Sequence, residues 1–554
     1  MHKSYWISLI ILLLPHTAAA QTGTCDQAQA EAFLDAGNVR ARIFNNGGLF
    51  WRGSPHVYEV PKGSGLNANF ANGLWVGGMI NDSLRVAATR YGLWEFWPGP
   101  LDDAGNPPIN CNLYDKIWEI RKKDIEAFIR TGDISSRLHN WPWQLGAPVI
   151  DGDGNPNNYN LQAGDLPELY GDQRLWWIMN DRGNVHQSSN SNAIGLEVHA
   201  SAHAFSHPGF ISNSTFYEYR LINKNKAPFN QAFVGVFGHN DLGNFDDNYV
   251  GSDSLLHLGF VYNADNEDEG GEGYGVAPPA IGITIFETTQ AESDNFDNNR
   301  NGLTDEPEEK LGAYGVMQFF GGGCVTCEPV EAADYYNYLQ SRWKDSTALV
   351  QGSWGYQRDD MPKREVTRFA YSGDPVNRSF WSAFNNDGLG NELIPPGARR
   401  FSISSGPYNL APTDTVLFRF AIVWSRGTDH LDSVTQLKQE VQEIRDFATS
   451  FYTPQSIEQN IPEPIESPLL GFDQNFPNPF SQSTTLRYSL PQTMQVRLAV
   501  YDLLGREVAV LVNAQQEAGI YTAQFDAGSL PAGIYLARIE LDFLRFTQRM
   551  VLIK

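Results

Sequence analysis

The stretch Thr484 to Asp502, TTLRYSLPQTMQVRLAVYD, indicates the fold of the C-terminal part of the chain. Apolar and polar residues largely alternate in two runs, Thr484 to Leu490 and Gln495 to Asp502. Successive side chains of a strand point to opposite faces, so this alternation predicts strands with one buried face. Four more runs follow between turn residues, at Glu507 to Val512, Tyr521 to Asp526, Gly533 to Leu541 and Arg545 to Leu552. We therefore expect a small antiparallel β-sandwich of about 80 residues.

Short motifs in the same region identify a family. Residues 472–554 resemble the type A C-terminal sorting domain of type IX secretion substrates, and the motifs occur in the family's order. The residues that carry the resemblance are Pro477, Asn478, Pro479, Tyr501, Asp502, Gly505, Arg506, Gly533, Tyr535 and Lys554. The resemblance implies an Ig-like sandwich that an outer-membrane translocon recognises, often followed by cleavage and then attachment to surface lipopolysaccharide or release. The alternative is an ordinary Ig-like module that contributes stability or adhesion.

Both ends of the chain predict export. Residues 1–20 are typical of a signal peptide, with Lys3 in a weakly basic start, an apolar run from Tyr5 to Leu14, and Ala18-Ala19-Ala20 as a cleavage site. The alternative is a transmembrane anchor, but the run is about half the roughly 20 residues that span a bilayer. We expect a mature protein without a transmembrane anchor that passes through the periplasm and is secreted or held at the cell surface. Residues 453–471, rich in Pro, Glu, Ser and Gln, are expected to be a linker.

The charge of the chain excludes one class of partner and favours another. The formal net charge is -24, with 40 Lys plus Arg against 64 Asp plus Glu. Nucleic-acid binding requires clustered basic residues that this composition lacks, so we expect no nucleic-acid partner. The sorting region, residues 473–554, has as many basic as acidic residues, so the excess acid lies in the rest of the mature chain. Cations are the more natural partner.

Residues 21–452 form the cargo region, and its pattern favours strands. Helix is expected only at Lys122 to Arg130 and at Val434 to Phe447, the second with a capping box that starts at Ser433. Asn81-Asp82 predicts a hairpin turn. The expected strands are Arg40 to Phe44, Gly73 to Ile80, Leu84 to Arg90, Leu175 to Asn180, Ile194 to Phe205, Ser214 to Asn223, Ala232 to Phe237, Leu256 to Tyr262, Ile281 to Phe286 and Thr415 to Trp424. The fold class is therefore mainly β: a large β-sandwich-like cargo region with few helices, followed by the sorting domain. In overall pattern the cargo is similar to uncharacterised exported proteins of the same bacteria, which implies no activity.

One loop matches the spacing of a calcium site. Ca²⁺ prefers six to eight oxygen ligands, which alternating short side chains can aim inward while a Gly permits the sharp turn. The candidate ligands are Asp297, Asn299, Asn301, Leu303 through its carbonyl, Asp305 and Glu308. The flanks are unlike an EF-hand helix pair, so we expect a structural calcium loop. The alternative is an acidic, solvated turn.

A second acidic loop departs further from that pattern. Asp151, Asp153 and Asn155 alternate as ligands would, but Pro156 stands where the turn Gly should be. A calcium site and a plain Asx-rich turn are both open here. Two looser acidic clusters, at 241–253 and 265–272, are expected to be solvated loops.

The four cysteines of the chain are expected to pair in an oxidising compartment. Four cysteines permit three connectivities. We favour Cys324 to Cys327, a local C-x-x-C bridge, together with Cys25 to Cys111.

Histidines and tryptophans raise two further possibilities. The spacing of His199, His203 and His207 suggests a zinc site, but the surrounding alternation predicts a strand and favours ordinary packing or surface histidines. Paired tryptophans suit either a core or a sugar-binding surface, and we favour core packing. The pairs are Trp94 with Trp97, Trp141 with Trp143, and Trp176 with Trp177.

The sequence thus predicts an exported protein with a calcium-stabilised, β-rich cargo in a binding or structural role. Its expected partners are the secretion machinery and either surface lipopolysaccharide or an extracellular polymer. The alternative is a secreted glycan-acting hydrolase. No motif decides whether the cargo is an enzyme.

Overall fold

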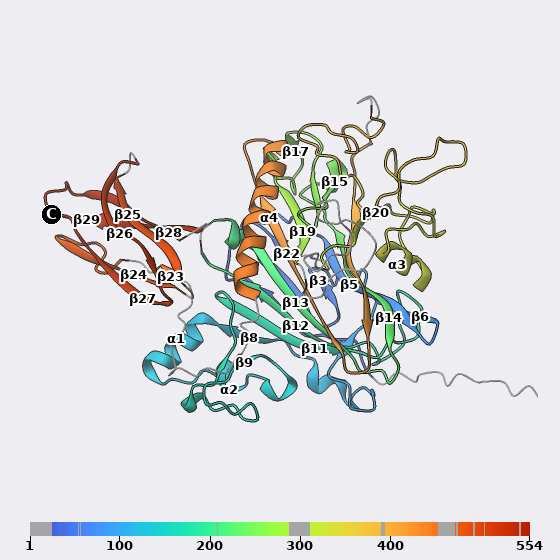
Figure 1. The fold of residues 1–554 in the computed structure, drawn as a ribbon, viewed down its shortest axis with the longest axis horizontal. Helices are drawn as coiled ribbons and strands as arrows, with labels where there is room; N and C mark the ends of the chain where they lie inside the picture. The colour runs from blue at the N-terminus through green and yellow to red at the C-terminus, as the bar shows by residue number, and fades with distance from the viewer. Residues whose placement is uncertain are drawn as a thin grey trace, which may run out of the picture. The chain divides into compact units, whose positions relative to one another are not determined.

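The computed structural model describes residues 25–53, 55, 57–207, 209–286, 288, 311–388, 394–452, 471–472, 475–490, 493–502, 505–541 and 544–553 (Figure 1). The chain divides into two compact units, one of residues 1–206 and 212–440 and the other of residues 207–211 and 441–554. The predicted signal peptide, the calcium loop at 297–308 and residues 453–470 of the predicted linker lie outside the described residues.

The described part of the first unit contains an antiparallel nine-stranded sheet that begins at the N-terminal end of the chain. Its main path runs β1-β2-β3-β5-β14-β21-β20, while β4 pairs with β2 and β6 with β5. These strands are β1 (Glu31–Leu34), β2 (Arg40–Phe44), β3 (Gly48–Leu49), β4 (Tyr58–Glu59), β5 (Ala71–Ile80), β6 (Ser83–Ala88), β14 (Phe229–His239), β20 (Gly315–Phe319) and β21 (Arg400–Leu410). The predicted hairpin is confirmed, because Asn81 and Asp82 join β5 to β6 with φ of 47° and 58°, as a two-residue turn of type I′ requires.

A second antiparallel nine-stranded sheet is present in the same described part. It runs β15-β16-β19-β22-β13-β12-β11-β7, with β8 paired to β11. The strands are β7 (Trp97–Pro98), β8 (Trp118–Arg121), β11 (Gln173–Asn180), β12 (Leu196–Ala204), β13 (Ser214–Asn223), β15 (Asn248–Asp253), β16 (Leu258–Asn263), β19 (Ala280–Ile285) and β22 (Thr415–Ser425). Two short hairpins lie outside both sheets, β9 (Val149–Ile150) with β10 (Leu166–Pro167) and β17 (Glu267–Asp268) with β18 (Gly275–Val276).

The core of the unit lies between the two sheets. Apolar side chains from both sheets form one buried cluster that includes Trp75, Val236, Trp177, Tyr217 and Phe420. The ring of Trp75 stacks on Phe237 at 5.4 Å within the first sheet, and Tyr217 stacks on Phe420 at 4.8 Å within the second. Large aromatic rings bury much apolar surface, which is the main favourable term in folding. The mainly β, sandwich-like cargo is confirmed.

The two predicted helices are present, but one predicted cap is wrong and two further α-helices were not predicted. α1 (Lys122–Thr131) ends at Gly132, whose φ of 76° is the left-handed conformation that commonly terminates helices. α4 (His430–Tyr452) contains the predicted segment, but the cap predicted at Ser433 is wrong. The helix begins earlier because the Asp429 carboxylate accepts the amides of Leu431 and Asp432. α2 (Ser136–His139) and α3 (Ala332–Leu339) complete the described α-helices.

The chain between β7 and β11 forms a lobe, which we define as residues 118–169. It holds α1, α2, β8, β9 and β10, and Figure 1 shows the first four beside β11. The lobe has a small core of its own, in which Trp141, Leu138 and Leu169 pack with Trp176 and Ile178 of β11. Trp118 and Trp176 lie opposite each other in the β8–β11 pair, with ring centroids 5.5 Å apart. The lobe is therefore fastened to the second sheet by aromatic packing.

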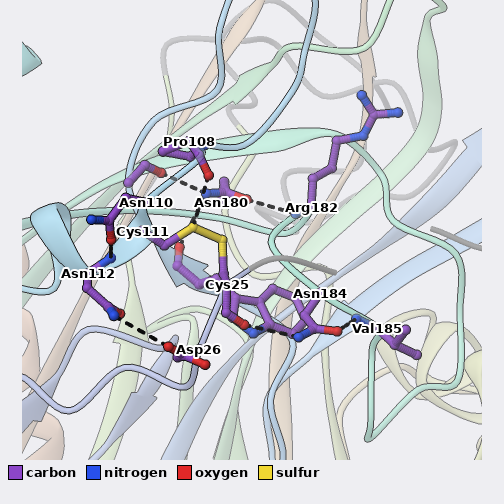
Figure 2. The surroundings of a disulfide bond; sticks show 12 residues. Cys25, Asp26, Pro108, Asn110, Cys111, Asn112, Asn180, Arg182, Asn184 and Val185 are labelled. Atoms are coloured by element: carbon purple, nitrogen blue, oxygen red, sulfur yellow. Dashed lines mark hydrogen bonds between the residues drawn. A yellow bond between two sulfur atoms is a disulfide. The ribbon is translucent and has the colours of Figure 1, made fainter. Parts of the chain in front are cut away.

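Both favoured cysteine pairs are disulfides in the structure. Cys25 and Cys111 are buried against Trp94 and Trp97, and their Cα atoms are 5.4 Å apart. Figure 2 shows the Asn184 amide donating to the Cys25 carbonyl at 3.0 Å, which ties the N-terminal segment down beside the bond. The bridge spans 86 residues of sequence, and loop-closure entropy assigns such a bridge roughly 4–5 kcal/mol.

The described part of the second unit contains two antiparallel sheets of three and four strands. One sheet runs β23-β24-β27 and the other β26-β25-β28-β29. The strands are β23 (Gly471–Phe472), β24 (Ser483–Leu490), β25 (Met494–Asp502), β26 (Glu507–Gln516), β27 (Gly519–Asp526), β28 (Gly533–Leu541) and β29 (Leu544–Leu552). All six strands predicted in this region are present, so their alternation was a sufficient signal.

Candidate functional site

An open groove of about 770 Å³ lies where the lobe meets the segment before β8. Tyr114, Trp118, Trp141 and Trp143 present aromatic surface to it. Trp141 is 3% exposed and belongs to the small core of the lobe, whereas Tyr114, Trp118 and Trp143 are half-buried, so these three rings are the ones that a ligand can reach. Flat rings of this kind pack against the apolar faces of sugar rings as well as against one another.

Local structure fixes these rings. Trp141 donates its indole N–H to the Pro148 carbonyl at 3.0 Å. A short 3-10 turn at Trp143–Leu145 then ends at Gly146, whose φ is 89°. On the opposite wall, Asn45, a buried residue from the turn after β2, donates to the carbonyls of Tyr114 and Lys116. The groove is thus held in shape by the sandwich beneath it.

The polar lining of the groove consists of amides and bases. Asn140 and Gln144 offer donors and acceptors, and Lys116 and His139 can offer positive charge. Among the described residues that line the groove, none is Asp or Glu. Glycoside hydrolysis ordinarily uses two carboxyl groups about 5 to 10 Å apart across the bond that is cleaved. The groove is therefore suited to holding a ligand and does not present a hydrolytic pair.

The second predicted calcium loop lies on the same lobe, between β9 and β10. Carboxylate oxygens of Asp151, Asp153 and Asp165 come within 4.8 Å of one another. Asp151 accepts the amides of Asp153, Gly154 and Asn155, as in an Asx turn. Asp165, buried at 1% exposure, accepts the amides of Gly152 and Asn160.

The predicted ligand Asn155 has a different position from the two aspartates. Its side-chain oxygen accepts the amide of Asn157 at 3.2 Å. The sequence pattern pointed to Asn155, whereas the strand pair β9–β10 brings Asp165 back to the loop. The sequence does show Asp165 as an acid downstream of the loop, but only a prediction that pairs Val149–Ile150 with Leu166–Pro167 would have placed it beside the two aspartates.

The tryptophan pairs divide between core and groove. Trp94, Trp97, Trp176 and Trp177 are buried, as core packing predicts, and only Trp143 of the six is half-buried. The prediction that His199 and His203 lie in a strand is confirmed, because both belong to β12. Val198 and Ala200 of this strand point to the core, and His199 points to the other face. His199 bonds Glu197 at 2.8 Å, which makes it a packed histidine on the outer face.

A buried charge cluster has the composition of an acid–base site but not its accessibility. His186 lies 3.2 Å from the Glu95 carboxylate and 3.8 Å from that of Asp181, and all three residues are at most 2% exposed. Burial opposes protonation of His186, yet its bond to Glu95 and the two negative charges outweigh burial and raise its pKa to about 9. With no route to a substrate, the cluster is structural.

The sorting motif residues are structural parts of the second unit. Asn478 donates to the Arg549 carbonyl at 3.1 Å and accepts the Val551 amide at 2.8 Å, which joins its segment to β29. Asp502 accepts the backbone and side-chain N–H of Arg506 across a turn in which Gly505 has a φ of 75°.

Other motif residues act similarly. Tyr535 donates its hydroxyl hydrogen to the Pro531 carbonyl at 2.8 Å. Pro477 offers its carbonyl to the Thr484 hydroxyl, and Gly533 opens β28. Pro479 lies in the segment before Phe480, and Lys554 lies outside the described residues. The motif therefore specifies turns and strand junctions.

Comparison with known proteins agrees with this unit. Residues 474–554 match the family described as the secretion system C-terminal sorting domain. The protein thus belongs to the class of type IX secretion substrates, and its sorting domain directs it to the cell surface or the extracellular space through the secretion machinery. Within the described chain, every helix is too short or too polar to cross a membrane.

For the cargo, the comparisons identify no activity. No curated protein matches the chain. A solved structure described as a polysaccharide lyase is similar over 64% of this chain and 34% of its own, with 7% identical residues and a TM-score of 0.18. This chain thus spans about a third of that structure's length, and a similarity of this size carries no functional meaning.

Proposed function

We propose that the exported protein binds an extracellular polysaccharide in the groove of the lobe. The observation that carries the proposal is that three half-buried aromatic residues, Tyr114, Trp118 and Trp143, line one open groove. Side-chain amides of Asn140 and Gln144 among the rings supply the hydrogen bonds that orient a sugar. A surface-delivered protein meets such polymers directly, and binding requires no carboxylate pair.

The proposal is tested with the purified mature protein and a panel of polysaccharides in affinity electrophoresis. Trp143→Ala is expected to weaken retention by about 5- to 150-fold, because truncating a stacking ring costs about 1–3 kcal/mol. The control is Trp354→Ala, which removes another partly exposed tryptophan outside the groove. If Trp143→Ala is retained as strongly as wild type, the groove is not the binding site. If the protein releases reducing ends from a polysaccharide, the alternative of a glycan-acting hydrolase is favoured.

We also propose that Ca²⁺ stabilises the lobe through the loop that holds Asp151, Asp153 and Asp165. These carboxylates would supply part of the oxygen set that Ca²⁺ prefers. Tyr159 on the same loop donates to the Leu138 carbonyl at 3.0 Å, so an ordered loop would brace the lobe's small core. The loop at 297–308 remains a second proposed calcium site.

Calorimetry of the full mature chain distinguishes the two calcium loops. Asp151→Asn with Asp153→Asn is expected to remove one binding event and lower the melting temperature in calcium, with no change in chelator. Asp297→Asn with Glu308→Gln should remove a separate event. An unchanged titration in both variants, or a wild type that binds no calcium, would overturn the proposal.

A further inference from the structure

A second hollow, of about 230 Å³, adjoins the groove on the outer face of the second sheet. Its floor comes from four neighbouring strands, β11, β12, β13 and β22, and its roof from Gly146 and Pro148 of the lobe. The floor residues are polar and charged: Arg174, His199, Ser201, Glu218, Arg220 and Thr415.

Strand register places these side chains together. His199 lies opposite Arg220, which lies opposite Leu417 in the next strand. Their sequence neighbours, such as Ala200 and Phe418, point to the core. Because side chains alternate along a strand, the same pairing that buries an apolar face gathers a charged face on the other side.

Most charges of this face are already neutralised in pairs. The Arg174 guanidinium, fully buried, donates to Glu168 at 3.0 Å and to Ser201 at 2.9 Å. Arg419 donates to Glu218 at 2.6 Å.

Arg220 differs from these arginines. It is exposed, it lines the hollow, and among the described residues it has no ion pair. The hollow therefore has one uncompensated positive charge, carried by the side chain best suited to hold a planar or tetrahedral anion.

The two cavities belong to one surface. Leu145 lines the groove and the next residue, Gly146, lines the hollow. Trp118 of the groove packs on Trp176 of the hollow. A Cβ on Gly146 would lie 2.6 Å from the His199 ring, so only glycine lets the lobe come this close to the sheet while keeping φ at 89°.

From this arrangement we propose that the polysaccharide is acidic and that the hollow receives one of its anionic groups, a carboxylate or a sulfate, against Arg220. The inference rests on the proposed function. Lys116 and His139 in the groove, with no acid among its lining residues, fit the same polymer charge. This is notable in a chain of net charge -24, whose remaining surface repels polyanions.

The experiment compares three immobilised polymers: a uronate polymer, its carboxyl-reduced neutral form, and a sulfated neutral polymer. The wild-type mature protein is expected to bind at least one anionic form about tenfold more tightly than the neutral one, and the preference should fall as salt is raised. Arg220→Gln should reduce the preference severalfold, since Lys116 still lines the groove, and leave binding to the neutral form unchanged.

Two controls separate the failures. Arg130→Gln removes an exposed arginine of α1 that lines neither cavity, and it should behave as wild type. Trp143→Ala should weaken binding to all forms. Equal binding of neutral and anionic polymers, or an anion preference that Arg220→Gln leaves at its wild-type size, overturns this inference alone. Absence of binding to every polymer overturns the proposed function with it. The stronger of the two anionic arms identifies carboxylate or sulfate as the group.

Discussion

At the scale of single residues, His186 is the side chain of the core whose charge matters most for stability. It lies between Glu95 and Asp181, and Glu95 also accepts the amides of Ala88, Ser188 and Ser189. The histidine supplies the positive charge that lets two carboxylates be buried side by side. A buried charge that loses its partner is far more costly than an exposed one.

We expect His186→Gln to lower the free energy of unfolding by about 3–5 kcal/mol near pH 7, because both carboxylates lose their cation. A histidine whose pKa is raised on folding stabilises fully below its unfolded value of 6.5, and the contribution is lost as pH rises through about 9. The gap between wild type and variant should therefore narrow as pH rises from about 6.5 to about 9 and stay constant above pH 9. Chemical denaturation followed by tryptophan fluorescence measures it, with the exposed His139→Gln as control. A variant as stable as wild type at pH 7 would refute the charge pairing.

Asp247 favours folding in its neutral form, whereas His186 favours folding in its charged form. Burial raises its pKa to about 7, and the negative charges of Asp268 and Glu269 act in the same direction. A carboxyl with a raised pKa favours folding while protonated, so its contribution is full below its unfolded value of 3.8 and is lost as pH rises through about 7.

Asp247→Asn should therefore gain melting temperature relative to wild type between pH 4 and 7 and keep a constant lead above pH 7. Thermal melts across this range measure the difference. Asp246→Asn, on the exposed neighbour, should follow the wild-type curve. Parallel curves for Asp247→Asn and wild type would show that the carboxyl is ionised in the folded protein.

At the scale of elements, the residues of the sorting motif act through geometry. Asn478 joins its segment to β29 by two side-chain hydrogen bonds, beside the backbone bonds that Phe480 makes with Val551 and Ile553. Asn478→Ala is expected to cost roughly 1–2 kcal/mol locally. Hydrogen exchange of the peptide 544–553 should quicken by about tenfold, while Asn513→Ala, on an exposed position of β26, should leave it unchanged. Equal protection in both variants would show that β29 is held without this residue.

Strands were predictable where the alternation of apolar and polar residues in the sequence matches the face that the fold buries. β13 was predicted to the residue, and six of the seven strands of the sorting region were found from their alternation, while the two-residue strand β23 was not. β21 (Arg400–Leu410) was missed because its sequence, RFSISSGPYNL, is rich in Ser, Gly and Pro, although eight of its eleven residues pair with β14. Such a strand is specified by its partners β14 and β20.

The groove was harder to predict from the sequence. Its tryptophans were noticed, but whether a ring faces a core or a groove depends on residues distant in sequence, such as Asn45 beside Tyr114. Asp165 and Arg220 carried no local motif, because strand pairing alone brings them to their sites.

At the scale of the whole molecule, the sorting domain and the proposed binding site lie in separate parts of the chain. A protein truncated after Pro468 is expected to remain inside the outer membrane, because it lacks the sorting domain. All tryptophans beyond the signal peptide precede residue 472, so fluorescence reports the cargo alone and should show the same unfolding midpoint with and without the domain. Antibody labelling of intact cells measures delivery to the surface. Labelling of cells that express the truncated protein would contradict the export route.

The part of the lobe that follows β8, residues 122–169, is a single continuous segment outside the nine-stranded sheet, and it packs on Trp176 and Ile178 of β11. Exchange of this one segment would leave the sandwich, its disulfides and the export signal in place. The architecture therefore allows new ligand preferences to arise by replacement of about fifty residues, and it offers the same position for grafting a foreign binding loop onto a bacterial surface.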